Sequence, residues 1–218
     1  MEPTLRLIDT ADWITMVLLT SLFFVVIGKS FFYNRFMNFI ILPFNNKYII
    51  MFNKKDRLIN WFHIFLTIFQ LFNFALFIYL ARRIVFQLDN SAYPFIYVLI
   101  LGLLGLFLLI KVILQLLNAF IFNITSTISE LIFKKLTYLN YSGIVMFLAN
   151  VILTYALKDS KTVVYVSFGL ILLINLIGWV NVIRNHQFYI TSNIFYFILY
   201  LCALEIAPFV IIGSYLKD

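Results

Sequence analysis

The chain of 218 residues is 64% hydrophobic and 11% charged, with a mean hydropathy of +1.02. Soluble domains carry about 25% charged and about 45–50% apolar residues, so this composition excludes an ordinary soluble fold and requires lipid as the solvent. The net charge of +7 arises from short basic clusters beside apolar runs. That pattern is typical of membrane proteins and argues against a nucleic-acid partner. The single cysteine, Cys202, excludes an intrachain disulfide.

The first apolar run predicts a membrane helix over residues 13–33 that is retained rather than cleaved. A signal peptide needs a positively charged start and a small-residue cleavage site. Here the acidic residues Glu2, Asp9 and Asp12 stand at the start, and no such cleavage site follows the apolar run.

Residues 34–57 form a basic, aromatic stretch that Pro43 interrupts. Two interpretations stay open: a segment in the membrane interface, with its aromatic side toward lipid and its cationic side toward headgroups, or an ordinary basic loop. The next apolar run predicts a second span over residues 58–81, closed by Arg82 and Arg83.

The third apolar run, over residues 93–124, is too long for one upright crossing. It would cover roughly 48 Å as a single helix at about 1.5 Å per residue, whereas the hydrocarbon core is only about 30 Å thick. We expect a span over residues 93–113 whose helix extends to about residue 134, near Lys134 and Lys135. The alternative is a further short membrane segment within residues 112–134.

Three more spans are predicted over residues 141–157, 162–182 and 188–214. The predicted fold class is therefore all-α, a polytopic transmembrane bundle of six helices in which residues 1–218 form a single integral membrane domain. With the amino terminus outside the cytoplasm, ten of the 16 basic residues fall on the cytoplasmic side. Because lysine and arginine accumulate in cytoplasmic loops, both termini are expected outside the cytoplasm.

Glu205, near the middle of the last predicted span, is the most informative residue in the chain. An ionisable group near the bilayer centre costs at least about 3 kcal/mol unless it is paired, protonated or hydrated. Pro208 deprives the Leu204 carbonyl of its helical donor, which predicts a kink beside this carboxyl group. The two residues form either a proton or cation site with a hinge, or a structural contact in which a protonated carboxyl bonds across helices.

Four polar residues of the second span, His63, Thr67, Gln70 and Asn73, have the spacing of one helix face. Such a face turns away from lipid, and it serves either a substrate path or interhelical hydrogen bonding. His63 is a poor metal ligand because the other histidine, His186, lies in a distant predicted loop without a cysteine or carboxylate cluster.

Lys111, Gln115 and Asn118 form a similar stripe on the third span. Lys111 either pairs with Glu205, if the long helix tilts, or extends its ammonium group to the cytoplasmic interface. Lone amides that we expect to make packing contacts are Asn150 and Asn175.

No pattern in the chain assembles the roles of an enzyme. The sequence has no glycine-rich nucleotide loop, no HExxH motif and no serine nucleophile with a plausible histidine and aspartate. We therefore expect no enzymatic activity, no cofactor and no metal site.

The run from Phe195 to Pro208 resembles the signature stretch of an uncharacterised bacterial inner-membrane family, catalogued only as a domain of unknown function. The most specific matches are Tyr200, Leu201, Cys202, Leu204, Glu205 and Pro208, with a weaker similarity over Asn140, Tyr141, Ser142 and Gly143. The resemblance covers roughly the second half of the chain. It implies a polytopic inner-membrane protein and supplies no activity.

The leading functional hypothesis is a non-enzymatic component of an envelope membrane-protein complex, in contact with the lipid bilayer and with other membrane proteins or copies of itself. The alternative is a small transporter or channel in which Glu205 binds a proton or a cation.

Overall fold

The computed structural model describes residues 12–42, 60–86, 94–121 and 125–185. The helices are α1 (Asp12–Phe31), α2 (Tyr33–Ile40), α4 (Trp61–Phe86), α5 (Pro94–Ile121), α6 (Thr125–Val151), a π-helical turn η1 (Ile152–Ala156) and α7 (Lys161–Asn185). No strand occurs in these ranges. The last predicted span, with Glu205 and Pro208, and the predicted loop around His186 lie outside them.

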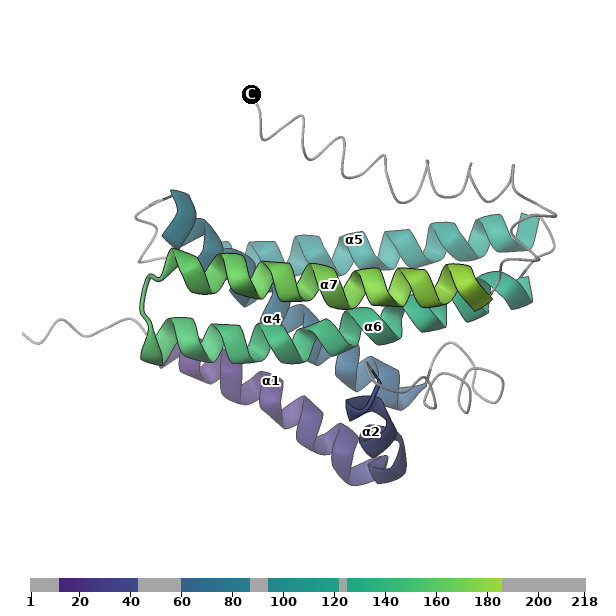
Figure 1. Ribbon diagram of the computed structural model, residues 1–218, viewed down its shortest axis with the longest axis horizontal. Helices are drawn as coiled ribbons and strands as arrows, with labels where there is room; N and C mark the ends of the chain where they lie inside the picture. The colour runs from purple at the N-terminus through teal and green to yellow at the C-terminus, as the bar shows by residue number, and fades with distance from the viewer. Residues whose placement is uncertain (1–11, 43–59, 87–93, 122–124, 186–218) are drawn as a thin grey trace, which may run out of the picture.

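Five of the helices are long and apolar enough to cross a membrane, namely α1, α4, α5, α6 with η1, and α7. Helices satisfy their backbone groups internally, which is what a chain in lipid requires. The predicted fold class, an all-α polytopic transmembrane bundle, is confirmed for the part of the chain that the structure describes. In Figure 1, α1, α5 and α7 run in one direction, and α4 and α6 run in the other.

The boundary between the third and fourth spans differs from the sequence prediction. Helix α5 ends at Ile121, and α6 begins at Thr125 instead of residue 141. Lys134 and Lys135 therefore lie inside the fourth span and not at the end of an extended third helix. The reversal coincides with a short polar sequence around Thr125, made of residue types that favour helix ends.

Helix α4 begins three residues after the predicted start of the second span, at Trp61, and ends five residues beyond its predicted end, at Phe86. The Asn60 side chain accepts a hydrogen bond from the Phe62 amide at 3.4 Å, which caps the start of α4. Helix α2 lies within the predicted interfacial stretch, and its Phe39 is fully buried against the rings of Phe62 and Tyr141. The aromatic side of α2 thus contacts the bundle, while residues 43–59 lie outside the described ranges.

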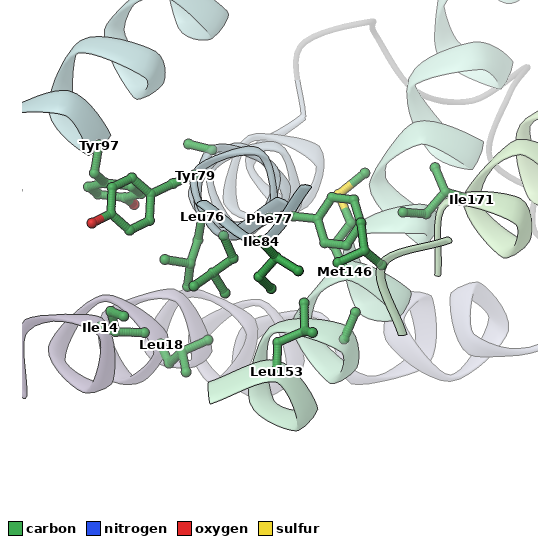
Figure 2. Packing of buried hydrophobic residues seen from close by; sticks show 14 residues of the cluster. Ile14, Leu18, Leu76, Phe77, Tyr79, Ile84, Tyr97, Met146, Leu153 and Ile171 are labelled. Carbon is green, nitrogen blue, oxygen red and sulfur yellow. The ribbon is translucent and has the colours of Figure 1, made fainter. Parts of the chain in front are cut away.

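Helices α4 and α6 form the centre of the bundle. Within the most apolar stretch of each of these two helices, half of the residues are buried. In the corresponding stretches, 22% are buried in α1 and α7 and 6% in α5. Figure 2 shows the main apolar contact, where side chains of α4 meet those of α1, α6 and η1. Its labelled members from these elements are Ile14, Leu18, Leu76, Phe77, Tyr79, Ile84, Met146 and Leu153.

Two glycines lie at close helix contacts. A Cβ atom on Gly143 of α6 would lie 3.0 Å from the Cβ of Gln70 on α4, and one on Gly178 of α7 would lie 2.6 Å from the Tyr138 ring. Small residues at such positions allow transmembrane helices to approach closely. The α4–α6 and α6–α7 contacts therefore depend on these positions lacking a side chain.

Candidate functional site

A line of polar side chains runs along the contact between α4 and α6, and we call it the polar seam. It consists of His63, Thr67, Gln70 and Asn73 from α4 with Asn140 and Asn150 from α6. All are buried except Thr67, which is partly buried. The four residues that the sequence placed on one face of the second span thus point into the bundle, whereas Asn140 was not foreseen as their partner.

Two amides of α6 bond to α4 at different heights of the seam. The Thr67 hydroxyl and the Asn140 amide lie side by side, with donor–acceptor distances of 3.2 and 3.3 Å. Further along, the Asn150 amide donates to the Asn73 carbonyl at 2.9 Å, and the Asn73 amide donates to the Phe69 carbonyl of its own helix. These bonds tie the two central helices together.

Gln70 lies between these two contacts, and its side chain is fully buried. Among the residues that the structure describes, neither its Nε2 nor its Oε1 atom has a hydrogen-bond partner, and the same holds for the Oδ1 atom of Asn150. A buried polar group left unsatisfied costs about 1–3 kcal/mol. Gln70 is thus the polar group in the seam whose burial is least explained by the hydrogen bonds that hold the helices together.

His63 lies at one end of the seam in an aromatic surrounding. Its ring packs edge-to-face on Phe133 at 4.6 Å and on Phe62 at 6.1 Å between ring centroids. Across the described ranges, no group of three or more histidine, cysteine, aspartate or glutamate residues is arranged to hold a metal ion.

A second set of side chains with polar members comes from α5, α6 and α7. The ammonium groups of Lys111 and Lys135 lie close enough to repel each other electrostatically, and Lys135 Nζ lies 4.9 Å from the centroid of the Trp179 ring. We call Lys111, Lys135 and Trp179 the basic cluster. The preceding residue of α6, Lys134, forms an ion pair with Glu130 at 2.7 Å.

The other residues of the third-span stripe differ in their surroundings. Gln115 is buried, and its Nε2 atom has no hydrogen-bond partner within the described ranges. The Asn118 amide donates to the Leu114 carbonyl of its own helix at 3.0 Å. Glu205, which the sequence offered as one of two alternatives for Lys111, lies outside the described ranges.

On α7, one of the two amide bonds crosses between helices and the other does not. The Asn175 amide donates to Ile171 of its own helix at 2.8 Å. The Asn181 amide instead donates to the Tyr138 hydroxyl of α6 at 2.7 Å, a contact that the sequence did not suggest.

The sequence held a signal for the basic cluster that was missed. Lys111 and Lys135 are equally distant from residue 123, which is midway between the end of α5 and the start of α6. In two antiparallel helices joined by a short connection, residues equally distant from the connection lie at the same height. The pairing was overlooked because Lys135 was assigned to the end of an extended helix.

The sequence model of the family described as Domain of unknown function (DUF4271) matches residues 14–216, and the chain belongs to this family. The expected membership in an uncharacterised family is confirmed, and the match extends well beyond the second half of the chain. Neither the curated proteins nor the solved structures include a significant match.

Proposed function

We propose that this member of the DUF4271 family is a non-enzymatic component of a membrane-protein complex in the inner membrane of the bacterial envelope. The observation that carries the proposal is the surface of α5. Only 6% of the residues in the most apolar stretch of α5 are buried, and large apolar side chains are exposed along the whole helix, from Phe95 to Ile121. Lipid can cover this surface, but so can the apolar helix of another membrane protein.

The polar seam supports the same proposal because most of its groups already serve helix packing. The Thr67–Asn140 and Asn73–Asn150 contacts join α4 to α6, and Asn181 joins α7 to Tyr138 of α6. Interhelical hydrogen bonds are the usual role of amides in membrane bundles. Amide contacts thus hold α4, α6 and α7 together, and α5 presents an exposed apolar face.

Site-specific photocrosslinking in native membranes tests the proposal. A photoreactive residue in place of Leu103 on α5 should give discrete products with another protein. The same residue in place of Leu19 on α1 is the matched control, because both side chains are 60% exposed. Protein crosslinks equally frequent at both positions, or none at either, would contradict a specific role for α5.

A small transporter or channel is the second candidate, with Glu205 as the proton or cation site. The fully buried Gln70 amide favours it, because a polar group without a partner inside a membrane bundle is typical of a substrate or ion path. Flux measured in proteoliposomes separates the candidates. A transporter must lose flux on Glu205→Gln while the protein still assembles normally.

A further inference from the structure

We propose that α2 lies in the plane of the membrane interface, with an apolar face toward acyl chains beside a polar face toward headgroups and water. The partner of its exposed surface is thus the lipid layer itself, at the boundary between acyl chains and headgroups. The amino-acid sequence of this stretch is equally compatible with an ordinary basic loop. The inference is independent of whether the protein belongs to a complex.

The length of α1 places the start of α2 at the edge of the hydrocarbon core. Helix α1 has 20 residues, which at about 1.5 Å per residue matches a core of about 30 Å. It ends at Phe31, and Phe32 leaves the helical conformation with a φ of −132° and a ψ of 48°. The Phe32 carbonyl accepts hydrogen bonds from the Arg35 and Phe36 amides at 3.0 Å, so α2 follows without a loop. Helix α2 therefore begins where the core ends.

One side of α2 is fixed against the bundle at this level. Phe39 and Leu42 are both fully buried. The Phe39 ring lies 6.1 Å from the ring of Phe62, the second residue of α4, and 5.7 Å from the ring of Tyr141 on α6. Figure 1 shows α2 beside the start of α4. These contacts hold α2 against the end of the bundle, so that it does not continue along the axis of α1.

The exposed side chains of α2 divide into two neighbouring faces. Tyr33, Met37 and Ile40 are exposed, and their spacing of four and three residues places them on one side, which we call the apolar face. Asn34 and Asn38 form the polar face beside it, where the Asn38 amide donates to the Asn34 carbonyl at 2.7 Å. Helices with adjoining apolar and polar faces lie in the membrane interface, with the apolar face buried about 5–10 Å into the boundary between headgroups and acyl chains.

The lipid-facing surface of α1 identifies what covers the apolar face. Phe23, Val26 and Phe31 in the second half of α1 are exposed, and on a span of membrane length such side chains contact acyl chains. Exposed apolar side chains then continue along the chain into α2, at the level of the headgroups. A protein partner would have to match the apolar and the polar face together, whereas the membrane boundary offers both surroundings to a helix that lies along it.

Site-directed spin labelling of the full chain in liposomes tests the proposal. In a Cys202→Ser background, a label at Ile40→Cys should collide often with oxygen, which dissolves in acyl chains, and rarely with a water-soluble nickel chelate. A label at Asn38→Cys should show the reverse preference, because residues two apart lie on opposite sides of a helix. The Ile40→Cys label should lie about 5–10 Å inside the headgroup boundary.

Two labelled positions elsewhere in the chain calibrate these collisions. Leu19→Cys on α1 reports acyl chains, because this side chain is 60% exposed on a membrane span. Lys158→Cys reports water, because this residue lies exposed in the turn before α7. Met37→Cys tests the same apolar face as Ile40→Cys, so the result does not depend on one variant folding.

Two outcomes would overturn the proposal. If labels at Met37→Cys and Ile40→Cys meet the nickel chelate as often as the label at Lys158→Cys does, the apolar face lies in water. If the same labels meet neither oxygen nor the chelate, a segment of protein covers the face, from this chain or from another.

Discussion

Gly143 of α6 lies directly against Gln70 of α4, so that the two central helices touch where a buried amide has no hydrogen-bond partner in the described part of the chain. A Cβ atom at Gly143 would come within 3.1 Å of the Gln70 Cα atom. Because the neighbour is backbone, it cannot move aside as the end of a flexible side chain can. The contact links the packing of the bundle to its candidate site.

Gly143→Ala should destabilise the protein by about 1–3 kcal/mol, the usual cost of overpacking a close contact. The measurement is thermal unfolding in a mild detergent, followed by loss of the monodisperse peak in size-exclusion chromatography. Gly102→Ala on α5 is the control, since nothing lies within 4 Å of its added Cβ atom. That variant should be as stable as the wild type or more stable by up to about 1 kcal/mol. Equal stability of the two variants would contradict the α4–α6 packing described above.

Gln70→Met should stabilise the protein by about 1–3 kcal/mol, because it removes an unsatisfied buried amide and keeps the shape of the side chain.

Asn140→Leu should have the opposite effect and lower the stability of the protein by about 1 kcal/mol, since the Asn140 amide is paired with Thr67. Both are measured by the same thermal unfolding. A less stable Gln70→Met variant would mean that the Gln70 amide has a ligand or water partner worth keeping, as the transporter alternative requires.

Glu205→Gln should leave ion or proton flux in proteoliposomes unchanged and should weaken assembly with partner proteins. The reason is that an amide keeps the size of the carboxyl but alters the hydrogen bonds it makes across helices. Flux is followed with a pH-sensitive dye inside the liposomes, and assembly by co-purification. Flux that is present in the wild type and lost in the variant, with assembly intact, would favour the transporter alternative.

Single-cysteine labelling should establish the orientation that the basic residues predict. In a Cys202→Ser background, Lys158→Cys in the turn before α7 should react with a membrane-impermeant maleimide in intact spheroplasts. Thr125→Cys, at the start of α6, should react only after the membrane is opened, because the basic side is expected in the cytoplasm. The reverse pattern would place both termini inside.

The apolar runs were sufficient to predict α1, α4 and α7 because each is one continuous stretch of membrane length between charged residues. The α5–α6 reversal was not predicted, since only a few polar residues interrupt the apolar sequence there and hydrophobicity alone does not report a short turn. The sequence predicts a helix end near Lys134 and Lys135, whereas in the structure Lys134 pairs with Glu130 and Lys135 packs on Trp179.

The sequence predicts which residues of the candidate site share a face of one helix, but not which residues of other helices they contact. The spacing of His63, Gln70 and Asn73 was enough to place them on one face, and burial of that face follows from the cost of exposing amides to lipid. Their partners depend on how α4 and α6 are placed against each other. That relative placement is set by close contacts such as the one at Gly143, which leave no periodic signal in either helix.

Co-purification in a mild detergent tests the central claim most directly. The tagged full chain, extracted from native membranes and weighed by native mass spectrometry, should appear together with other membrane proteins, or further copies of itself, in a fixed ratio. A chain that is recovered only as a monomer with bound lipid, across several mild detergents, would contradict its proposed role in a membrane-protein complex.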